Sequence, residues 1–98
     1  MSDVINAAKR GDLSLLKHLT QGNKNILGKT NSEGYFALYW AACCGHEDVC
    51  RYILESGANV DQTVKTGSSA LHAAADRGHM ECVQILVNRY LFRFYSFL

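Results

Sequence analysis

Three potential metal ligands, Cys43, His46 and Cys50, stand at a spacing that would place them on one face of a single helix. Cysteine and histidine are side chains that zinc prefers, so this spacing raises a metal site as a hypothesis. Gly45 interrupts any helix that would hold all three, and cysteine is commonly a core residue. We therefore favour buried or half-buried thiols over a metal site, and we expect no cofactor.

The adjacent Cys43 and Cys44 raise redox chemistry as a second hypothesis. A reactive cysteine needs a neighbouring base or a charge that stabilises its thiolate, and the sequence places neither beside this pair. Histidine catalysis would need a partnered nucleophile or acid, but the chain has no Ser/His/Asp spacing and no glycine-rich phosphate loop. His46 and His79 each follow a glycine instead, which predicts that both satisfy turns and backbone groups of adjoining units. We expect a protein that is not an enzyme.

The glycine–histidine pairs belong to a longer internal repeat. Residues 37–46 align with residues 70–79 at an offset of 33. Residues 7–12 align with residues 41–46 at an offset of 34, which makes the N-terminus a first, abbreviated unit. Such a period is typical of repeat proteins, in which each helix-turn-helix unit buries its apolar face against its neighbours.

Apolar periodicity predicts where the helices lie within each unit. Residues 3–19 contain two short helical faces, and the second unit contains helices over about residues 36–43 and 47–55. Gly57 is expected to stop the latter helix in the left-handed conformation. The predicted packing stripes of the last helices in the second and third units are Val49, Cys50, Ile53 and Leu54, and Cys82, Val83, Leu86 and Val87.

Two polar connections link the units. Residues 21–35 contain three glycines and show no helical period, so we interpret them as a long finger loop. Residues 59–66 form a second finger loop of ordinary length.

The composition excludes several classes of function. The chain has 98 residues, enough for one small domain, and a formal net charge of +1, without the basic run that nucleic acid or an anionic membrane would require. Four cysteines inside helical patterns favour reduced thiols in the cytoplasm or nucleus over a secreted disulfide framework. We expect no targeting segment, and no transmembrane segment, because residues 85–98 are too short and carry Arg89 and Arg93.

The third unit carries the motif G-x-S-x-L-H-x-A-A-x-x-G-H over residues 67–79, and a Gly-Ala pair follows the second unit at residues 57 and 58. Together with the period of 33, these features resemble the ankyrin repeat family. The resemblance implies an all-α solenoid of about three repeats with finger loops, over approximately residues 2–30, 31–63 and 64–89 of a domain at residues 1–89.

Two departures from the family pattern affect individual positions. The family's Thr-Pro is replaced by Ser69-Ala70 and by Phe36-Ala37, and the lack of proline should soften both helix starts. The family's histidine is present as His72, where it could bond to neighbouring fingers, but Tyr39 replaces it in the second repeat.

The resemblance implies recognition of another protein on a concave face built from finger loops and first helices. The mixed charges of this face argue against a phosphate or polyacidic ligand. Tyr39 and Trp40 fit packing between repeats as well as a binding anchor. The contact positions that the resemblance implies, together with Trp40, are Lys9, Arg10, Ser32, Glu33, Tyr35, Trp40, Cys43, Cys44, Lys65, Thr66, Ser68, Asp76 and Arg77.

Residues 90–98 form an apolar tail with five aromatic residues. Tyr90 stands where the second repeat has Gly57, so the helix is expected either to run on or to give way to an irregular path. The tail could fold back as a cap on the third repeat, mediate self-association as a homo-oligomer, or be the remnant of a longer array. We favour the first and third together, because an uncovered apolar patch promotes aggregation. The alternative function is a structural or self-associating element driven by this tail.

Overall fold

The computed structural model describes residues 3–95 of the chain. Within these residues the only β-type pairing is an isolated bridge between Thr63 and Ser69. The helical elements are α1 (Asp3–Arg10), α2 (Leu13–Thr20), the 3-10 helix η1 (Lys24–Gly28), α3 (Ala37–Cys43), α4 (Glu47–Glu55), α5 (Ala70–Asp76) and α6 (Met80–Tyr95).

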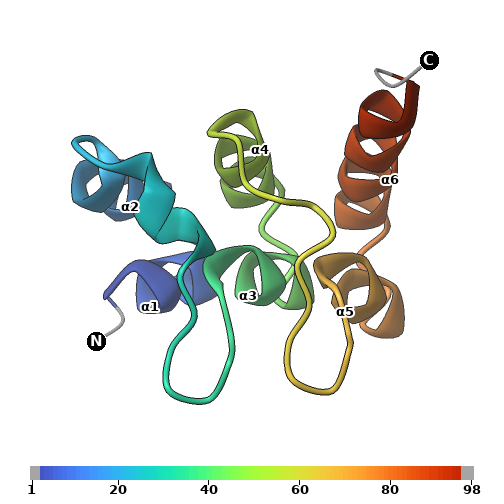
Figure 1. The fold of residues 1–98 in the computed structure, drawn as a ribbon, viewed down its shortest axis with the longest axis horizontal. Coiled ribbons are helices and arrows are strands. Elements are labelled where there is room, and N and C mark those ends of the chain that lie inside the picture. The colour runs from blue at the N-terminus through green and yellow to red at the C-terminus, as the bar shows by residue number, and fades with distance from the viewer. Residues whose placement is uncertain (1–2, 96–98) are drawn as a thin grey trace.

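The α-helices form three pairs that stack side by side (Figure 1). The inner helices α1, α3 and α5 lie in one row, and the outer helices α2, α4 and α6 form a second row. Two loops project beyond the inner row, a first finger between η1 and α3 and a second finger between α4 and α5. The predicted all-α solenoid of about three helix-turn-helix repeats is confirmed.

Each repeat is joined to the preceding one through the histidine that follows its turn glycine. The His46 ring lies against Gly11, where φ is +76°, and a Cβ added to that glycine would lie 2.6 Å from the ring Nδ1. The His79 ring lies against Gly45 in the same way, at 2.7 Å. The Nε2 of His46 also donates to the carbonyl oxygen of Lys9 at 2.9 Å. The prediction that these histidines satisfy backbone groups of adjoining repeats is confirmed for His46, whereas the contact shown for His79 is its packing on Gly45.

The two later inner helices begin differently. Phe36 precedes α3 without a side-chain cap, whereas Ser69 caps α5. The backbone N–H of Ser69 donates to Nδ1 of His72 at 3.2 Å, and the backbone N–H of His72 donates to the Ser69 hydroxyl at 3.4 Å. This capping box satisfies free N–H groups at the helix start. The His72 ring is therefore engaged within its own repeat rather than by neighbouring fingers, contrary to expectation.

The outer helices bury the predicted stripes to different extents. The four stripe residues of α4 are all buried: Val49, Cys50, Ile53 and Leu54. In α6, Cys82 and Leu86 are buried, whereas Val83 and Val87 are half-buried. The difference arises because α6 is the last helix of the described stack and has a neighbour on one side only.

The first connection contains an element that periodicity did not indicate. Residues 24–28 form η1, with Asn23 capping its start by accepting from the backbone N–H of Asn25 at 3.1 Å. Leu27 is 2% exposed and packs into the core, which holds this turn in place. A single turn is too short to show an apolar period, so the expectation of an irregular segment over residues 21–35 was wrong here.

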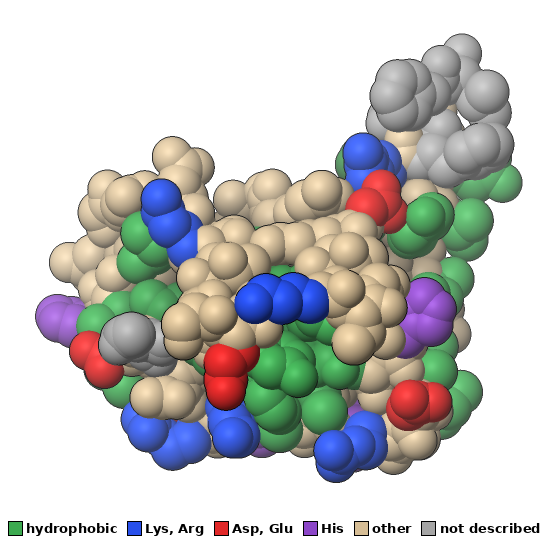
Figure 2. Space-filling view, turned by 60° about the horizontal axis from the view of Figure 1, so that its bottom comes forward, with side chains coloured by type: hydrophobic (Ala, Val, Ile, Leu, Met, Phe, Trp, Pro, Cys, Tyr) green, Lys and Arg blue, Asp and Glu red, His purple; other side chains and the backbone are tan. Residues whose placement is uncertain are grey.

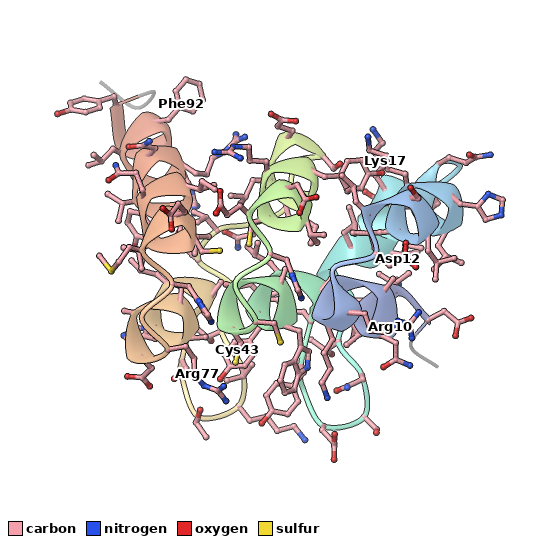
Figure 3. The ribbon with its side chains drawn as sticks, turned by 180° about the vertical axis from the view of Figure 1, so that it is seen from behind. Arg10, Asp12, Lys17, Cys43, Arg77 and Phe92 are labelled. Carbon is pink, nitrogen blue, oxygen red and sulfur yellow. The ribbon has the colours of Figure 1, made fainter. Side chains whose placement is uncertain are left out.

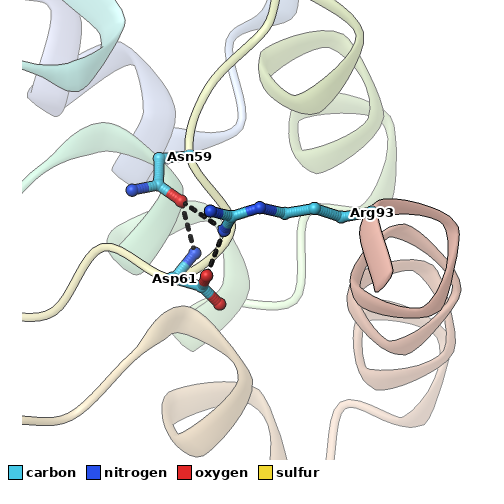
Figure 4. A network of polar contacts seen from close by, with 3 residues as sticks. All are labelled: Asn59, Asp61 and Arg93. Atoms are coloured by element: carbon cyan, nitrogen blue, oxygen red, sulfur yellow. Dashed lines mark hydrogen bonds and ion pairs between the residues drawn. The ribbon is translucent and has the colours of Figure 1, made fainter. Parts of the chain in front are cut away.

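Helix α6 continues through Tyr95, so the first of the two alternatives for the tail is correct. The expected fold-back over the third repeat is absent from the described residues; residues 96–98 of the predicted tail lie outside them. The guanidinium of Arg93 instead reaches Asp61 and the side-chain oxygen of Asn59, in the connection after α4 (Figure 4). Without a glycine to end it, the helix runs on and leaves Phe92 65% exposed.

Within residues 3–95, no helix combines the length and apolar character needed to cross a membrane.

Candidate functional site

Three aromatic rings meet on the face formed by the first finger and α3. The ring centre of Tyr35 lies 5.4 Å from that of Tyr39 and 5.3 Å from that of Trp40, and the Tyr39 and Trp40 rings are 5.9 Å apart. All three side chains are half-buried. Figure 2 shows hydrophobic side chains gathered in the middle of this face, with charged side chains around them. We call Tyr35, Tyr39 and Trp40 the aromatic patch.

The base of the first finger fixes the orientation of the aromatic patch. Asn31 and Tyr35 exchange hydrogen bonds: the Asn31 N–H donates to the Tyr35 carbonyl at 2.9 Å, and the Tyr35 N–H donates to the Asn31 Oδ1 at 3.0 Å. Below the patch, Phe36 is 1% exposed and its ring lies 6.0 Å from Tyr39, edge to face. The patch is thus anchored in the core before any partner arrives.

Cations lie at both sides of the aromatic patch. The Nζ of Lys9 lies 4.5 Å from the centre of the Trp40 ring, a cation–π contact worth about 0.5–1 kcal/mol at an exposed site. On the α5 side, Asp76 and Arg77 are exposed. Burial raises the pKa of Tyr39, as do the nearby Cys43, Tyr35 and Asp76, while Arg77 opposes the shift. Both charged residues of α5 are therefore within electrostatic reach of the patch.

The two fingers contact each other through Lys65. A Cβ added to Gly34, where φ is +89°, would lie 2.8 Å from the Cγ of Lys65, so the lysine stem packs directly on this glycine. The Lys65 side chain remains exposed, with its charge available at the finger surface.

The two adjacent cysteines differ in their access to this face. Cys43 is 6% exposed and offers little area to a partner, whereas Cys44 is half-buried. Burial and the neighbouring Cys43 raise the pKa of the Cys44 thiol, although Lys9 and Arg77 oppose the shift. A protonated thiol is a weak nucleophile, so the raised pKa disfavours redox chemistry at Cys44.

The remaining predicted contact residues belong to the ends of the inner helices or to the two fingers. Figure 3 labels Arg10 and Arg77 along the inner helices, and Lys17 on the outer row. Ser32 and Glu33 are exposed in the first finger and Thr66 in the second, while Ser68 is half-buried and its carbonyl accepts from Val64. The part each of these side chains plays in binding remains a prediction.

The aromatic patch includes one residue that the predicted contact set omits. Tyr39 contacts both Tyr35 and Trp40, and the pattern at residues 39 and 40 left open whether it packs or binds. The resemblance had pointed to Tyr39 only as a replacement for histidine. The sequence signal that could have added Tyr39 to the contact set was an aromatic residue at that position, directly before Trp40.

Across the part of the chain that the structure describes, no group of three His, Cys, Asp or Glu side chains is placed to hold a metal ion.

Comparisons with known proteins identify the family. A family model described as ankyrin repeats in three copies matches residues 4–93. Dauer abnormal formation protein 25 of Caenorhabditis elegans is 38% identical over 88 residues, covering 90% of this chain and 23% of that protein. Ankyrin repeat domain-containing protein 63 of Mus musculus is 38% identical over 84 residues, covering 82% of this chain and 21% of that protein.

A solved structure has the same fold. One chain of the complex between the Bd0816 predatory endopeptidase from Bdellovibrio bacteriovorus and the immunity protein Bd3460 superposes with a TM-score of 0.85 at 27% identity. The match covers 91% of this chain and 46% of that chain. The present chain thus spans less than half of each of these proteins. The repeats, the fold and the matches show that the chain belongs to the ankyrin repeat family, whose members generally serve as protein-interaction modules.

Proposed function

We propose that the chain is a non-catalytic module that binds a partner protein on its concave face, formed by the fingers and inner helices. The observation that carries this proposal is the aromatic patch, with Lys9 at one side and Arg77 at the other. Tyrosine, tryptophan and arginine supply much of the binding energy in protein interfaces. The patch is already anchored by Asn31 and Phe36, so little side-chain entropy is lost on binding.

Paired variants on opposite faces test the proposal. Tyr35→Ala with Arg77→Ala removes one ring and one cation from the concave face. Lys17→Ala with His18→Ala is the matched control, because both residues are exposed on the outer helix α2. Proteins captured from a cell extract are quantified by mass spectrometry for all three chains, and helical content is checked by circular dichroism.

The expected result is that partners captured by the unchanged chain persist with the outer-face variant and are lost with the concave-face variant. Undiminished capture by a folded concave-face variant would remove the assignment of the binding face.

The state of the cysteines supports a location in the cytoplasm or nucleus. All four, Cys43, Cys44, Cys50 and Cys82, are free thiols. Reducing compartments maintain such thiols, whereas small secreted domains commonly pair them. Fluorescence imaging of the tagged chain tests this location; a secretory signal would contradict it.

As a second candidate function, we propose self-association through α6. Four large apolar side chains near its end are exposed: Tyr90, Leu91, Phe92 and Tyr95, by 47–65%. Leu71, Val87, Tyr90 and Leu91 also line a hollow of about 450 Å³ between α5 and α6. Exposed apolar groups at this density favour association. Sedimentation velocity of the chain and of Leu91→Asn with Phe92→Asn tests this; an unchanged mass would contradict it.

A further inference from the structure

The concave face carries an excess of positive charge. Among the exposed residues of the predicted contact set, Lys9, Arg10, Lys65 and Arg77 carry positive charge, and Glu33 and Asp76 carry negative charge. Within residues 3–95, the only ion pair joins Arg93 to Asp61, far along α6, so none of the four cations is neutralised by a carboxylate contact. The face has a charge of +2 from these six residues, compared with +1 for the whole chain.

One cation lies over the aromatic patch and a second lies near it at the end of α5. The Lys9 ammonium is over the Trp40 ring, 4.5 Å from its centre. Asp76 and the α5 C-cap residue Arg77 act on Tyr39 in opposite senses. Both cations also act on Cys44, the C-cap residue of α3, which is the helix between α1 and α5. Cations therefore lie on two sides of the aromatic patch, and on the α5 side the Asp76 carboxylate stands beside the cation. The cation–π contact holds the Lys9 ammonium in position, which lowers the entropy lost when it meets an anion.

Resting on the proposed function, we propose that the partner presents an extended protein segment with one large apolar side chain and carboxylates on both sides of it. The apolar side chain lies on the aromatic patch, while the carboxylates pair with Lys9 or Arg10 at one side and Arg77 at the other. Charge complementarity selects this segment over a basic one, because like charges brought together across an interface are strongly disfavoured.

The two carboxylates of the face limit how many acidic residues the partner segment can carry. Glu33 is exposed on the first finger and Asp76 at the end of α5, beside the cations. A continuous acidic tract or a phosphate chain would meet these groups and be repelled. Aromatic rings with cations also suit single-stranded nucleic acid, but its regularly spaced phosphates would meet the same repulsion. The face therefore favours isolated carboxylates around an apolar anchor.

Selection from a phage library of random linear peptides on the immobilised full chain tests the proposal. Peptides that bind the chain but not its Trp40→Ala variant are sequenced, and their affinities are measured. The expected peptides contain an apolar residue with Asp or Glu on both sides, in excess of the unselected library.

Charge variants then locate the contacts. Lys9→Gln and Arg77→Gln should each weaken the selected peptides about twofold to fivefold, with a smaller loss at high salt. Lys17→Gln, the same type of change on the outer face, should have no effect. Replacing the peptide carboxylates by amides should reproduce the loss and abolish the difference between the variants.

The other outcomes are separable. Peptides that depend on Trp40 but show no acidic excess would overturn this inference and leave the proposed function standing. If no recovered peptide depends on Trp40 for binding, both this inference and the proposed binding of linear protein segments on the concave face are overturned. Binding of a short oligothymidylate with an affinity equal to that of the selected peptides would overturn the choice of protein over nucleic acid.

Discussion

The imidazole of His46 donates a hydrogen bond to the backbone carbonyl of Lys9, at 2.9 Å, across the boundary between the first two repeats. The same Lys9 places its ammonium over the Trp40 ring on the concave face. One residue thus belongs both to the inter-repeat contact and to the candidate binding surface. A substitution at this boundary is therefore expected to change both the stability of the stack and the geometry of the aromatic patch.

Replacing His46 by Ala should lower the free energy of unfolding by about 1–3 kcal/mol, since it removes a hydrogen bond and the ring that fills the space over Gly11. Urea unfolding monitored by circular dichroism measures the change. His18→Ala is the control, because His18 is exposed on α2 and should alter stability by less than about 0.5 kcal/mol. Equal effects of the two variants would show that the His46 contact contributes nothing specific.

Gly45→Ala and Gly78→Ala form a matched pair, because both glycines have similar positive φ values, +77° and +74°. A Cβ at Gly45 would lie 2.7 Å from Nδ1 of His79, whereas nothing lies within 4 Å of one at Gly78. Both variants incur the left-handed penalty of about 1–2 kcal/mol, and Gly45→Ala should be worse by about a further 1–3 kcal/mol. Thermal and urea unfolding measure this difference. Matching losses would argue against the ring contact.

Tyr52→Phe tests a polar contact between the first two outer helices. The Thr20 hydroxyl donates to the Leu16 carbonyl at 2.8 Å, so the Tyr52 hydroxyl donates to Thr20 at 2.6 Å. Removing it should reduce the free energy of unfolding by about 0.5–1.5 kcal/mol while leaving the ring in place. The chain with Tyr35→Phe, a change on the concave face, provides a comparison. A loss restricted to Tyr52→Phe would support the contact.

The stability should fall as the pH rises above the ordinary range of a thiol. Burial, followed by the neighbouring Cys82 thiol, strongly raises the pKa of Cys50. The folded state therefore retains a proton that the unfolded chain loses above about pH 8.5, so the stabilisation is complete below that pH. Above it, the free energy of unfolding should decrease by up to about 1.4 kcal/mol per pH unit for this thiol.

Urea unfolding at several pH values between about 7 and 9.5 measures this dependence. Cys50→Ala should be less stable at neutral pH but should show a shallower decrease. An unchanged slope in that variant would assign the dependence to other groups.

The repeat architecture was predictable because its signals are local and occur more than once. The turn at Gly45 and the buried stripe of α4 could be recognised from spacing, and their counterparts around Gly78 strengthened the interpretation. In contrast, η1 is one turn long and depends on burial of Leu27, a tertiary effect. The contact of Arg93, near the end of α6, with Asp61 joins distant parts of the sequence and gives no local signal.

The candidate site was predictable in its residue types more than in their arrangement. The family pattern indicated Lys9 and Arg77, and the preference of interfaces for tryptophan indicated Trp40. The cation over the indole ring, however, requires α1 and α3 to be adjacent in space. The family pattern also indicated Cys43 as a contact position, whereas its side chain is only 6% exposed. A one-residue rotation around a short helix decides between these outcomes, and apolar periodicity does not resolve it.

The histidine-over-glycine contact also gives the stack a direction, because each histidine packs on the turn glycine of the preceding repeat. No histidine packs on Gly78, and nothing lies within 4 Å of a Cβ added to that glycine. In the first repeat, Asp12 stands where the later repeats have this histidine, and its side chain caps α2. A second copy stacked on the third repeat would therefore present Asp12, and no histidine, to Gly78. The histidine-over-glycine contact therefore cannot form head to tail between two copies, because Asp12 stands where the imidazole would have to be.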